Sequence, residues 1–186
     1  LVRDLTAGAE VLDVFSCTGG FSVHAAAGGA AAVTSVDLSR QALDTAERNV
    51  GHNRDDAAVA ACRHTTIRGD AFAVMDELVA ERRRFDVVIV DPPSFAPRQA
   101  AVAGALDAYR RLARRAVRLR KPGGTLVQAS CSSRVPAEQF HALVHDAAAT
   151  EGAVLGERAR TGHPLDHPIG FPQGAYLKAL VATVGR

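Results

Sequence analysis

FDVVIVD, residues 85–91, is the stretch of sequence that decides the fold. From Val87 to Val90 it is an unbroken run of β-branched residues. A strand that is buried on both faces reads as such a run, and strands of this kind belong to parallel sheets with helices on both sides. We therefore predict a central strand at these residues, inside an α/β fold.

Short aliphatic runs and longer amphipathic segments alternate along the rest of the chain. Strands are expected at residues 11–15, 33–37, 62–68, 124–132, 153–158 and 175–184. Helices are expected at residues 21–28, 72–82, 104–120 and 137–149, and a further helix, N-capped by Ser39, continues to Val50. Crossovers of a dozen or more residues connect the early strands, which is typical of a mostly parallel sheet.

Composition limits the remaining alternatives. The chain has 186 residues and a formal net charge of +2, which suits a single domain over residues 1–186 and does not by itself indicate a nucleic-acid-binding protein. It has no apolar run of the roughly 20 residues that a membrane span requires, and no signal peptide is recognisable. The three cysteines lack metal-ligand spacing, so we expect a cytoplasmic protein without a metal site. The oligomeric state stays open, with a homodimer as one alternative.

The segment VLDVFSCTGGF, residues 11–21, predicts a ligand site where the first strand turns into the first helix. Gly19 and Gly20 permit a tight turn there, but neither the G-x-G-x-x-G spacing nor a P-loop is present. Asp37 ends the second strand, where it can accept hydrogen bonds from two ribose hydroxyls, and Asp70 follows the third. Each feature alone fits an ordinary turn or an acidic N-cap. Together, at the ends of successive strands, they indicate a nucleoside ligand.

Five motifs in this order resemble one known family. They are VLDVFSCTGGFSVHAAAGGA, VTSVDLSRQAL, DPPSF, SCSS and FPQGAYLKAL. The sequence is similar to class I S-adenosylmethionine-dependent methyltransferases over nearly its whole length, and within them to the bacterial large-subunit ribosomal RNA cytosine carbon-5 methyltransferases. That family also carries an N-terminal RNA-binding PUA domain and a linking domain, which have no counterpart here, so the sequence resembles the catalytic domain alone.

The resemblance implies a Rossmann-like, seven-stranded, mostly parallel sheet with a terminal antiparallel hairpin, and S-adenosylmethionine as cofactor. It assigns the methionine end of the cofactor to the turn at residues 15–20, the ribose to Asp37 and the adenine to Asp70 and Ala71. The family usually has an aromatic residue where this chain has Cys17. The full set of expected cofactor-binding residues is Asp13, Phe15, Gly19, Gly20, Phe21, Asp37, Leu38, Asp70, Ala71 and Asp91.

DPPSF predicts a pocket for a planar base. Asp91 and the carbonyls around Pro92 and Pro93 form a rigid set of acceptors, because each proline fixes φ and removes a competing N–H. Phe95 can stack on the base, a contact worth roughly 1–3 kcal/mol. Methyltransferases that act on base amines use similar acceptors, so this motif alone does not identify the reacting atom. The expected substrate-binding residues are Pro92, Pro93, Phe95, Arg98, Ser130 and His167.

Cys131 bears on the reacting atom. Carbon 5 of cytosine is a poor nucleophile until a thiolate adds to carbon 6, and Cys131 is expected at the end of a strand beside Asp91. The expected catalytic residues are therefore Cys131 and Asp91, with ribosomal RNA as partner. Three alternatives stay open: Cys131 as an inert packing residue, a methyltransferase acting on a base nitrogen, and a non-catalytic binding module.

Basic and histidine residues supply two further features. The expected helix at 104–120 and the residue after it carry a stripe of positive charge made of Arg110, Arg111, Arg114, Arg115, Arg118, Arg120 and Lys121. Without acidic partners on that helix, the stripe fits either phosphate binding or a solvated face. Arg98 is expected beside a phosphate of the flipped nucleotide. By resemblance, His163 and His167 belong to a substrate loop; surface histidines are the alternative.

Overall fold

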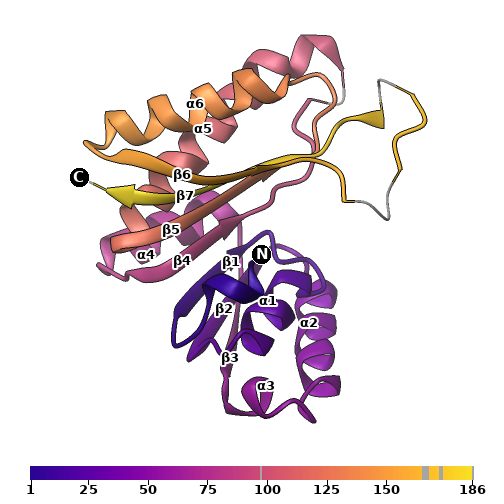
Figure 1. The fold of residues 1–186 in the computed structure, drawn as a ribbon, viewed down its shortest axis with the longest axis vertical. Coiled ribbons are helices and arrows are strands. Elements are labelled where there is room, and N and C mark those ends of the chain that lie inside the picture. The colour runs from indigo at the N-terminus through magenta and orange to yellow at the C-terminus, as the bar shows by residue number, and fades with distance from the viewer. Residues whose placement is uncertain (97, 165–167, 172–173, 186) are drawn as a thin grey trace.

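The computed structural model describes residues 1–96, 98–164, 168–171 and 174–185. Seven strands form one sheet in the order β3-β2-β1-β4-β5-β7-β6. The strands are β1 (Glu10–Val14), β2 (Ala32–Asp37), β3 (Arg63–Arg68), β4 (Phe85–Val90), β5 (Arg120–Ser130), β6 (Val154–Thr161) and β7 (Lys178–Gly185). β1 to β5 run parallel, whereas β7 pairs antiparallel with both β5 and β6. The predicted seven-stranded sheet with a terminal antiparallel hairpin is confirmed (Figure 1).

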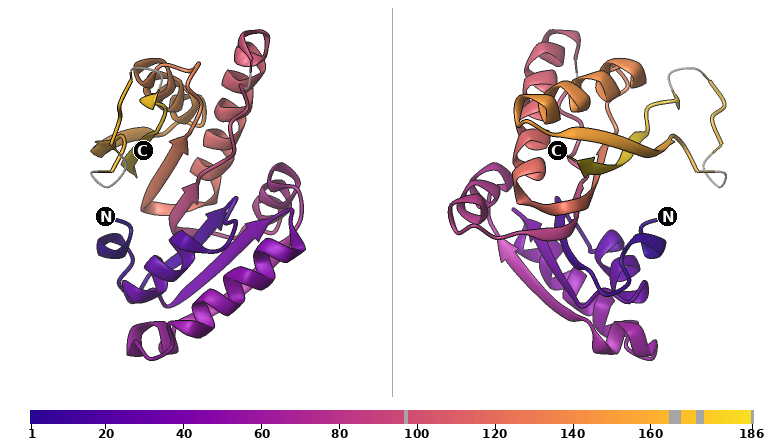
Figure 2. Two further views of the ribbon diagram at one scale, coloured as in Figure 1. Left: turned by 90° about the vertical axis from the view of Figure 1, so that its right-hand side faces the viewer. Right: turned by 60° about the vertical axis from the view of Figure 1, so that its left-hand side comes forward.

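Helices cover both faces of the sheet (Figure 2). The helical elements are η1 (Arg3–Leu5), α1 (Gly20–Ala27), α2 (Arg40–His52), α3 (Ala57–Ala61), α4 (Ala71–Ala80), η2 (Gln99–Ala101), α5 (Val102–Leu119) and α6 (Ala137–Thr150). Buried residues of α4, α5 and α6 form one hydrophobic layer, and buried residues of α1, α2 and α3 form the other. Among the described residues, no helix is long and apolar enough to cross a membrane.

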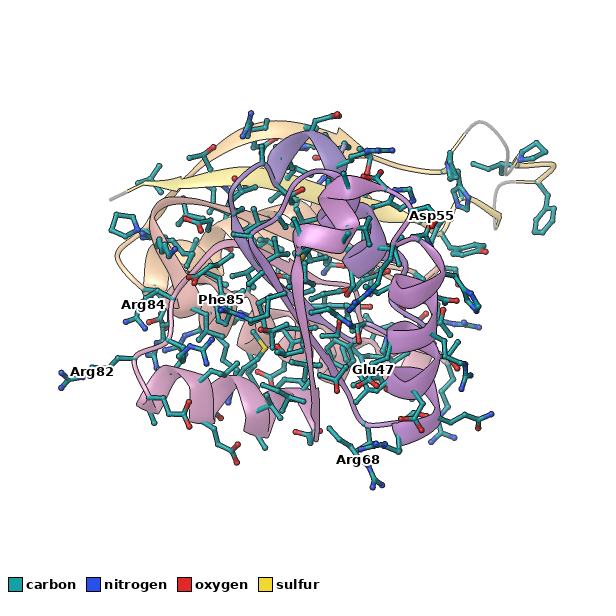
Figure 3. All side chains as sticks on the ribbon, turned by 90° about the horizontal axis from the view of Figure 1, so that it is seen from below. Glu47, Asp55, Arg68, Arg82, Arg84 and Phe85 are labelled. Carbon is teal, nitrogen blue, oxygen red and sulfur yellow. The ribbon has the colours of Figure 1, made fainter. Side chains whose placement is uncertain are left out.

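The surroundings of strand β4 explain why apolar and polar residues do not alternate from Val87 to Val90. Val88 and Val90 pack into the layer with α4, α5 and α6, whereas Val87 and Ile89 pack into the opposite layer. Side chains alternate between the two faces of a strand, and from Val87 to Val90 both faces are buried, so all four positions are apolar. The strand begins at Phe85, which is buried, while Arg82 and Arg84 just before it extend away from the ribbon (Figure 3).

Two strands and one short helix differ most from the expectations. β7 begins at Lys178 rather than at residue 175, because Nε2 of His163 accepts hydrogen bonds from the N–H groups of Tyr176 and Leu177, each at 3.0 Å. β5 starts at Arg120, where a helix-stop signal was expected, and ends at Ser130. The short helix α3 was not predicted from the sequence; Asp56 caps it by accepting from the Ala58 N–H at 2.9 Å.

The sheet order positions the candidate site. β1 pairs with β2 on one side and with β4 on the other, so the chain reverses its direction of progression across the sheet at β1. In open parallel sheets, ligands bind beside the carboxyl ends of the strands at such a switch point. The residues that follow β1, β2, β4 and β5 therefore meet at one edge.

Candidate functional site

The turn after β1 is held in a strained conformation. Phe15 and Cys17 have φ values of 63° and 49°, and Gly19 has 79°. Non-glycine residues adopt left-handed backbone only where neighbours fix it, and here the Ser16 N–H donates to the Val36 carbonyl at 3.0 Å. A Cβ on Gly19 would lie 2.7 Å from the Cβ of Ala46. The glycine thus serves both the turn and the close approach of α2.

The carboxylates of Asp37 and Asp70 organise the neighbouring backbone. Asp37 accepts hydrogen bonds from the N–H groups of Cys17 at 2.9 Å and Ser39 at 2.8 Å, which ties the β1 turn to the start of α2. Asp70 caps α4 by accepting from the Ala73 N–H at 3.0 Å. An ionised carboxylate offers about four acceptor positions, so both side chains can cap the backbone and still receive a ligand.

These residues line one cavity of about 540 Å³, a size typical of small-molecule sites. Following the order of the strands, the cavity has two parts. The part here called the cofactor half is made by Phe15, Cys17, Asp37, Leu38, Asp70 and Ala71. The part called the acceptor half is made by Asp91, Pro92, Pro93, Cys131 and Leu177. A second hollow, of about 350 Å³, lies over the β1 turn and is lined by Gly20 and Phe21 among others. It shares Phe15, Cys17 and Asp91 with the first.

The acceptor half brings together the two predicted catalytic residues. Cys131 directly follows β5, and its thiol points to the Pro92 carbonyl with Sγ 3.9 Å from the oxygen. Burial raises the pKa of Cys131, the charge of Asp91 raises it further, and Lys178 acts in the opposite direction. Burial also raises the pKa of Asp91. The hydroxyls of Ser94 and Ser132, 3.1 Å apart, link the two loops that carry these residues.

Two predicted substrate-binding residues lie behind the cavity and do not line it. The ring of Phe95 packs 6.3 Å from that of Phe15 and 5.3 Å from that of Tyr109, at the edge of the core. Ser130 is buried and donates to the Tyr109 hydroxyl at 2.9 Å. In this arrangement Phe95 and Ser130 support the walls of the acceptor half, which differs from the expected contacts with a base. Arg98 is exposed, and His167 lies outside the described residues.

Asp13, predicted as a cofactor ligand, lies inside the protein beneath the turn. It is fully buried, and the Ser22 hydroxyl donates to it at 2.6 Å. The chain of polar contacts continues from Ser22 to Ser35 at 2.7 Å and from Ser35 to Nε2 of His64 at 2.7 Å. Burial raises the pKa of Asp13 to about 7, despite the Ser22 hydrogen bond that lowers it. Asp13 does not line the 540 Å³ cavity, and its predicted role as a direct ligand remains a prediction.

The arginine stripe has acidic partners that come from other elements. Arg114 and Arg118 each contact Glu151 at 2.6 Å, at the end of α6. Arg115 contacts Asp76 of α4 at 2.7 Å, and the guanidinium of Arg111 stacks on Phe72 with 4.7 Å to the ring centroid. These contacts tie α5 to both neighbouring helices. The expectation of a positive stripe rather than a set of salt bridges is therefore wrong for Arg114, Arg115 and Arg118. Only partners on the same helix can be inferred from sequence spacing, and these partners lie on other elements.

Lys178 and Tyr109 were missed by the sequence reasoning. The buried ammonium of Lys178 donates to the Ser132 carbonyl, next to Cys131. A lysine inside the apolar run of the last strand is the signal that could have indicated it, because buried lysines need a specific reason. Tyr109 lies within the expected α5 and has no comparable signal.

Comparison with known proteins identifies the family of this chain. A family model described as S-adenosylmethionine-dependent methyltransferase matches residues 1–182. The ribosomal RNA large subunit methyltransferase of Deinococcus radiodurans is 41% identical over 179 residues, which cover 96% of this chain and 43% of that protein. The ribosomal RNA large subunit methyltransferase I of Shewanella amazonensis is 42% identical over 182 residues, covering 95% of this chain and 44% of that protein. The chain thus spans less than half the length of these curated relatives.

Solved structures show the same fold. The crystal structure of SMU.776 complexed with SAH has a TM-score of 0.82 at 24% identity and covers 98% of this chain and 47% of that one. NSun6 from Pyrococcus horikoshii, solved with SFG, has a TM-score of 0.69 at 18% identity and covers 99% of this chain and 49% of that one. With the family model over nearly its whole length, the chain belongs to the S-adenosylmethionine-dependent methyltransferase family.

Proposed function

We propose that this chain transfers a methyl group from S-adenosylmethionine to carbon 5 of a cytosine in large-subunit ribosomal RNA, through a covalent adduct with Cys131. The observation that carries the proposal is the position of Cys131, beside Asp91 and Pro92 in the acceptor half of the cavity. The names of the relatives support ribosomal RNA as the substrate class. The three cysteines are free thiols, which suits a cytoplasmic enzyme.

The cofactor half fits a nucleoside cofactor. Asp37 presents its carboxylate at the end of β2, where it would accept hydrogen bonds from ribose hydroxyls, and Asp70 and Ala71 would contact the adenine. The β1 turn, with Gly20 and Phe21 facing the second hollow, would hold the methionine portion. When bound, S-adenosylmethionine supplies an electrophilic methyl group.

The acceptor half supplies the nucleophile and the proton transfers. The Cys131 thiolate adds to carbon 6 of cytosine, so that an S–C6 bond forms and the C5=C6 π electrons become available at carbon 5. Carbon 5 would then accept the methyl group as the methyl–sulfur bond of the cofactor breaks and S-adenosylhomocysteine is left. Carbon 5 would at that point carry both the methyl group and its original hydrogen. A base then removes that proton, the C5=C6 bond forms again, and the S–C6 bond breaks to release the thiolate. Asp91 holds the edge of the cytosine and takes part in the proton transfers.

A methyltransferase acting on a base nitrogen is the second candidate, because the acceptors Asp91, Pro92 and Pro93 would serve an amino group equally well. In that reaction no thiolate addition is needed, and Cys131 would have no chemical role. The two candidate reactions therefore differ in whether the sulfur of Cys131 bonds to the base. A non-catalytic binding module would need neither Cys131 nor a methyl acceptor.

A mechanism-based probe tests the proposal. The protein is incubated with S-adenosylmethionine and large-subunit RNA that contains 5-fluorocytidine, and denaturing gels and mass spectrometry are used to detect a covalent complex. Fluorine at carbon 5 cannot leave as a proton does, so the adduct should accumulate in the unmodified protein and be absent from Cys131→Ala. Cys62→Ala, which removes a buried sulfur that does not line the cavity, is the matched control and should form the adduct.

Each alternative has its own outcome in this experiment. Methylation that survives Cys131→Ala would contradict the carbon-5 reaction and support the nitrogen one. A protein that binds S-adenosylmethionine and RNA but transfers no methyl group would be a binding module. A folded protein that does not bind S-adenosylmethionine would contradict both enzymatic functions.

A further inference from the structure

Lys178 is a buried cation at the acceptor half of the cavity. It is the first residue of β7, opposite Ser130 of β5, and its exposed fraction is 6%. Its ammonium donates to the Ser132 carbonyl and to the Tyr176 carbonyl, the latter at 3.0 Å. Among the described residues, no carboxylate forms an ion pair with it.

A buried ammonium held only by neutral carbonyls is costly. Burial of a charge is unfavourable unless a counter-charge is close, and lysine commonly loses its proton instead. Burial lowers the pKa of Lys178, and the charge of Cys131 counteracts this. A negative charge on Cys131, the residue before Ser132, would therefore favour the protonated form of Lys178.

The charged and titratable groups that act on Cys131 come from three elements. Asp91, after β4, disfavours a negative sulfur through its charge. Tyr109, on α5, also senses the sulfur, because burial and the charge of Cys131 both raise the pKa of this tyrosine. Lys178, on β7, favours a negative sulfur. Without Lys178, the pKa of this half-buried thiol next to a carboxylate would be higher still, and a protonated thiol is a poor nucleophile.

We propose that Lys178 is a positioning residue that favours the thiolate form of Cys131, by its charge and by anchoring the peptide at Ser132. This deepens the proposed function and rests on it for its role in methyl transfer. In its protonated form Lys178 would stabilise the sulfur before addition to carbon 6 and again when the S–C6 bond breaks. The backbone contact fixes the segment that carries the sulfur, since Ser132 is the next residue after Cys131.

The thiolate can be measured without any methylation assay. The rate of alkylation of Cys131 by iodoacetamide is followed from pH 6 to pH 10, with peptide mass spectrometry to distinguish it from Cys17 and Cys62. Three proteins are compared: the unmodified chain, Lys178→Gln, which keeps a hydrogen-bond donor but loses the charge, and Lys178→Arg, which keeps the charge. In Lys178→Gln the alkylation of Cys131 at neutral pH should be about tenfold slower, as expected if the pKa of the thiol rises by one.

The two variants and an internal control decide the outcome. Lys178→Arg should stay closer to the unmodified protein than Lys178→Gln, and the alkylation of Cys17 should be the same in all three. Equal profiles for Gln and Arg, or a Gln variant that matches the unmodified protein, would overturn the proposal. If Lys178→Gln does not fold, Lys178→Met, which removes the charge without adding a polar group to the interior, takes its place in the same comparison.

The experiments can contradict the role of Lys178 and the proposed function independently of each other. If Lys178 controls the Cys131 thiolate but Cys131→Ala still methylates RNA, the pairing of the two residues stands and the carbon-5 mechanism is wrong. If the 5-fluorocytidine adduct forms but the alkylation profile is unaffected by Lys178→Gln, the mechanism stands and this inference is wrong. A decrease in kcat at neutral pH that is recovered at high pH would link the two.

Discussion

The two halves of the cavity use carboxylates in opposite ways. In the cofactor half, Asp37 and Asp70 accept hydrogen bonds from backbone N–H groups that their own strand ends and helices present. In the acceptor half, burial raises the pKa of Asp91, and the same is true of Cys131 beside it. We therefore interpret the first half as the part that would bind the cofactor, because its carboxylates already fix the backbone that lines the cavity. Under the proposed function the second half would carry the reaction, because burial raises the pKa values of both its carboxyl and its thiol group.

The same difference is consistent with the positions of backbone strain and of the proposed reactive groups. The strained backbone follows β1, whereas Asp91 and Cys131 follow β4 and β5. The left-handed residues Phe15 and Cys17 belong to the cofactor half, where a fixed backbone shape suits a ligand that is always the same. In the proposed reaction the target base would change protonation and hybridisation, so the acceptor half would need groups that can exchange protons. Changes in the cofactor half should therefore affect the affinity for S-adenosylmethionine, and changes in the acceptor half should affect the rate.

The largest effect is expected from Cys131→Ser. A hydroxyl is far less ionised than a thiol, so the variant should lose methylation by about a thousandfold or more, in line with the loss of a catalytic nucleophile. Its affinity for S-adenosylmethionine, measured by calorimetry, should stay within about twofold, because the sulfur belongs to the acceptor half. Cys62→Ser is the control for an internal cysteine. A large loss of cofactor affinity in Cys131→Ser would contradict the assignment of separate roles to the two halves of the cavity.

The rate should also increase with pH. The pKa of Cys131 is raised by burial and by Asp91, so at neutral pH the thiol is mostly protonated and the reactive thiolate is the minor form. Each unit of pH then raises the thiolate fraction about tenfold, which gives about a hundredfold between pH 6.5 and pH 8.5. The measurement is the single-turnover rate with S-adenosylmethionine and RNA saturating. A flat profile would mean that ionisation of Cys131 does not limit the reaction, and cofactor binding over the same range is the control.

Asp37→Ala should weaken cofactor binding without a matching loss of rate. The substitution removes two backbone hydrogen bonds and the acceptor for the ribose, and hydrogen bonds to a charged group contribute about 1.5–3 kcal/mol each. We expect at least about a tenfold increase in Kd for S-adenosylmethionine, while kcat at saturating cofactor should change by less than about threefold. Asp44→Ala, on the surface of α2 and paired with Arg40, is the control. A variant with unchanged Kd and reduced kcat would contradict the assignment of Asp37 to the cofactor half.

Most of the fold could be predicted because its signals are local. The apolar run of β4 indicated a strand buried on both faces, and Ser39 caps α2 as expected, with its side chain accepting from the Ala42 N–H at 3.2 Å. The start of β7 could not be predicted. It depends on His163, whose imidazole occupies the N–H groups of residues 176 and 177 from the other side of a loop, and no local pattern shows such a contact.

The candidate site was predictable at the strand ends and less so behind them. Asp37, Asp70, Asp91 and Cys131 follow strands whose order the α/β pattern implies, and all four line the same cavity. Phe95 and Asp13 occupy the same segments, but their side chains turn into the protein, and sequence alone does not give side-chain direction at a turn. Lys178 lies more than forty residues from Cys131, so their proximity depends on the antiparallel pairing of β5 and β7.

The smallest expected effect is at Asp70, and it separates two roles that the sequence left open. If Asp70 both caps α4 and contacts the adenine, Asp70→Asn should keep the cap, because asparagine is as good an N-cap as aspartate, whereas Asp70→Ala should lose about 1 kcal/mol of unfolding free energy. Both variants should bind S-adenosylmethionine a few-fold more weakly, because both lose the carboxylate charge. Asp56→Ala removes the equivalent cap of α3, which does not line the cavity, and should reduce stability alone. If Asp70→Ala also reduced only the stability, Asp70 would be a cap and no more, and the cofactor half would depend on Asp37 for its polar recognition of the nucleoside.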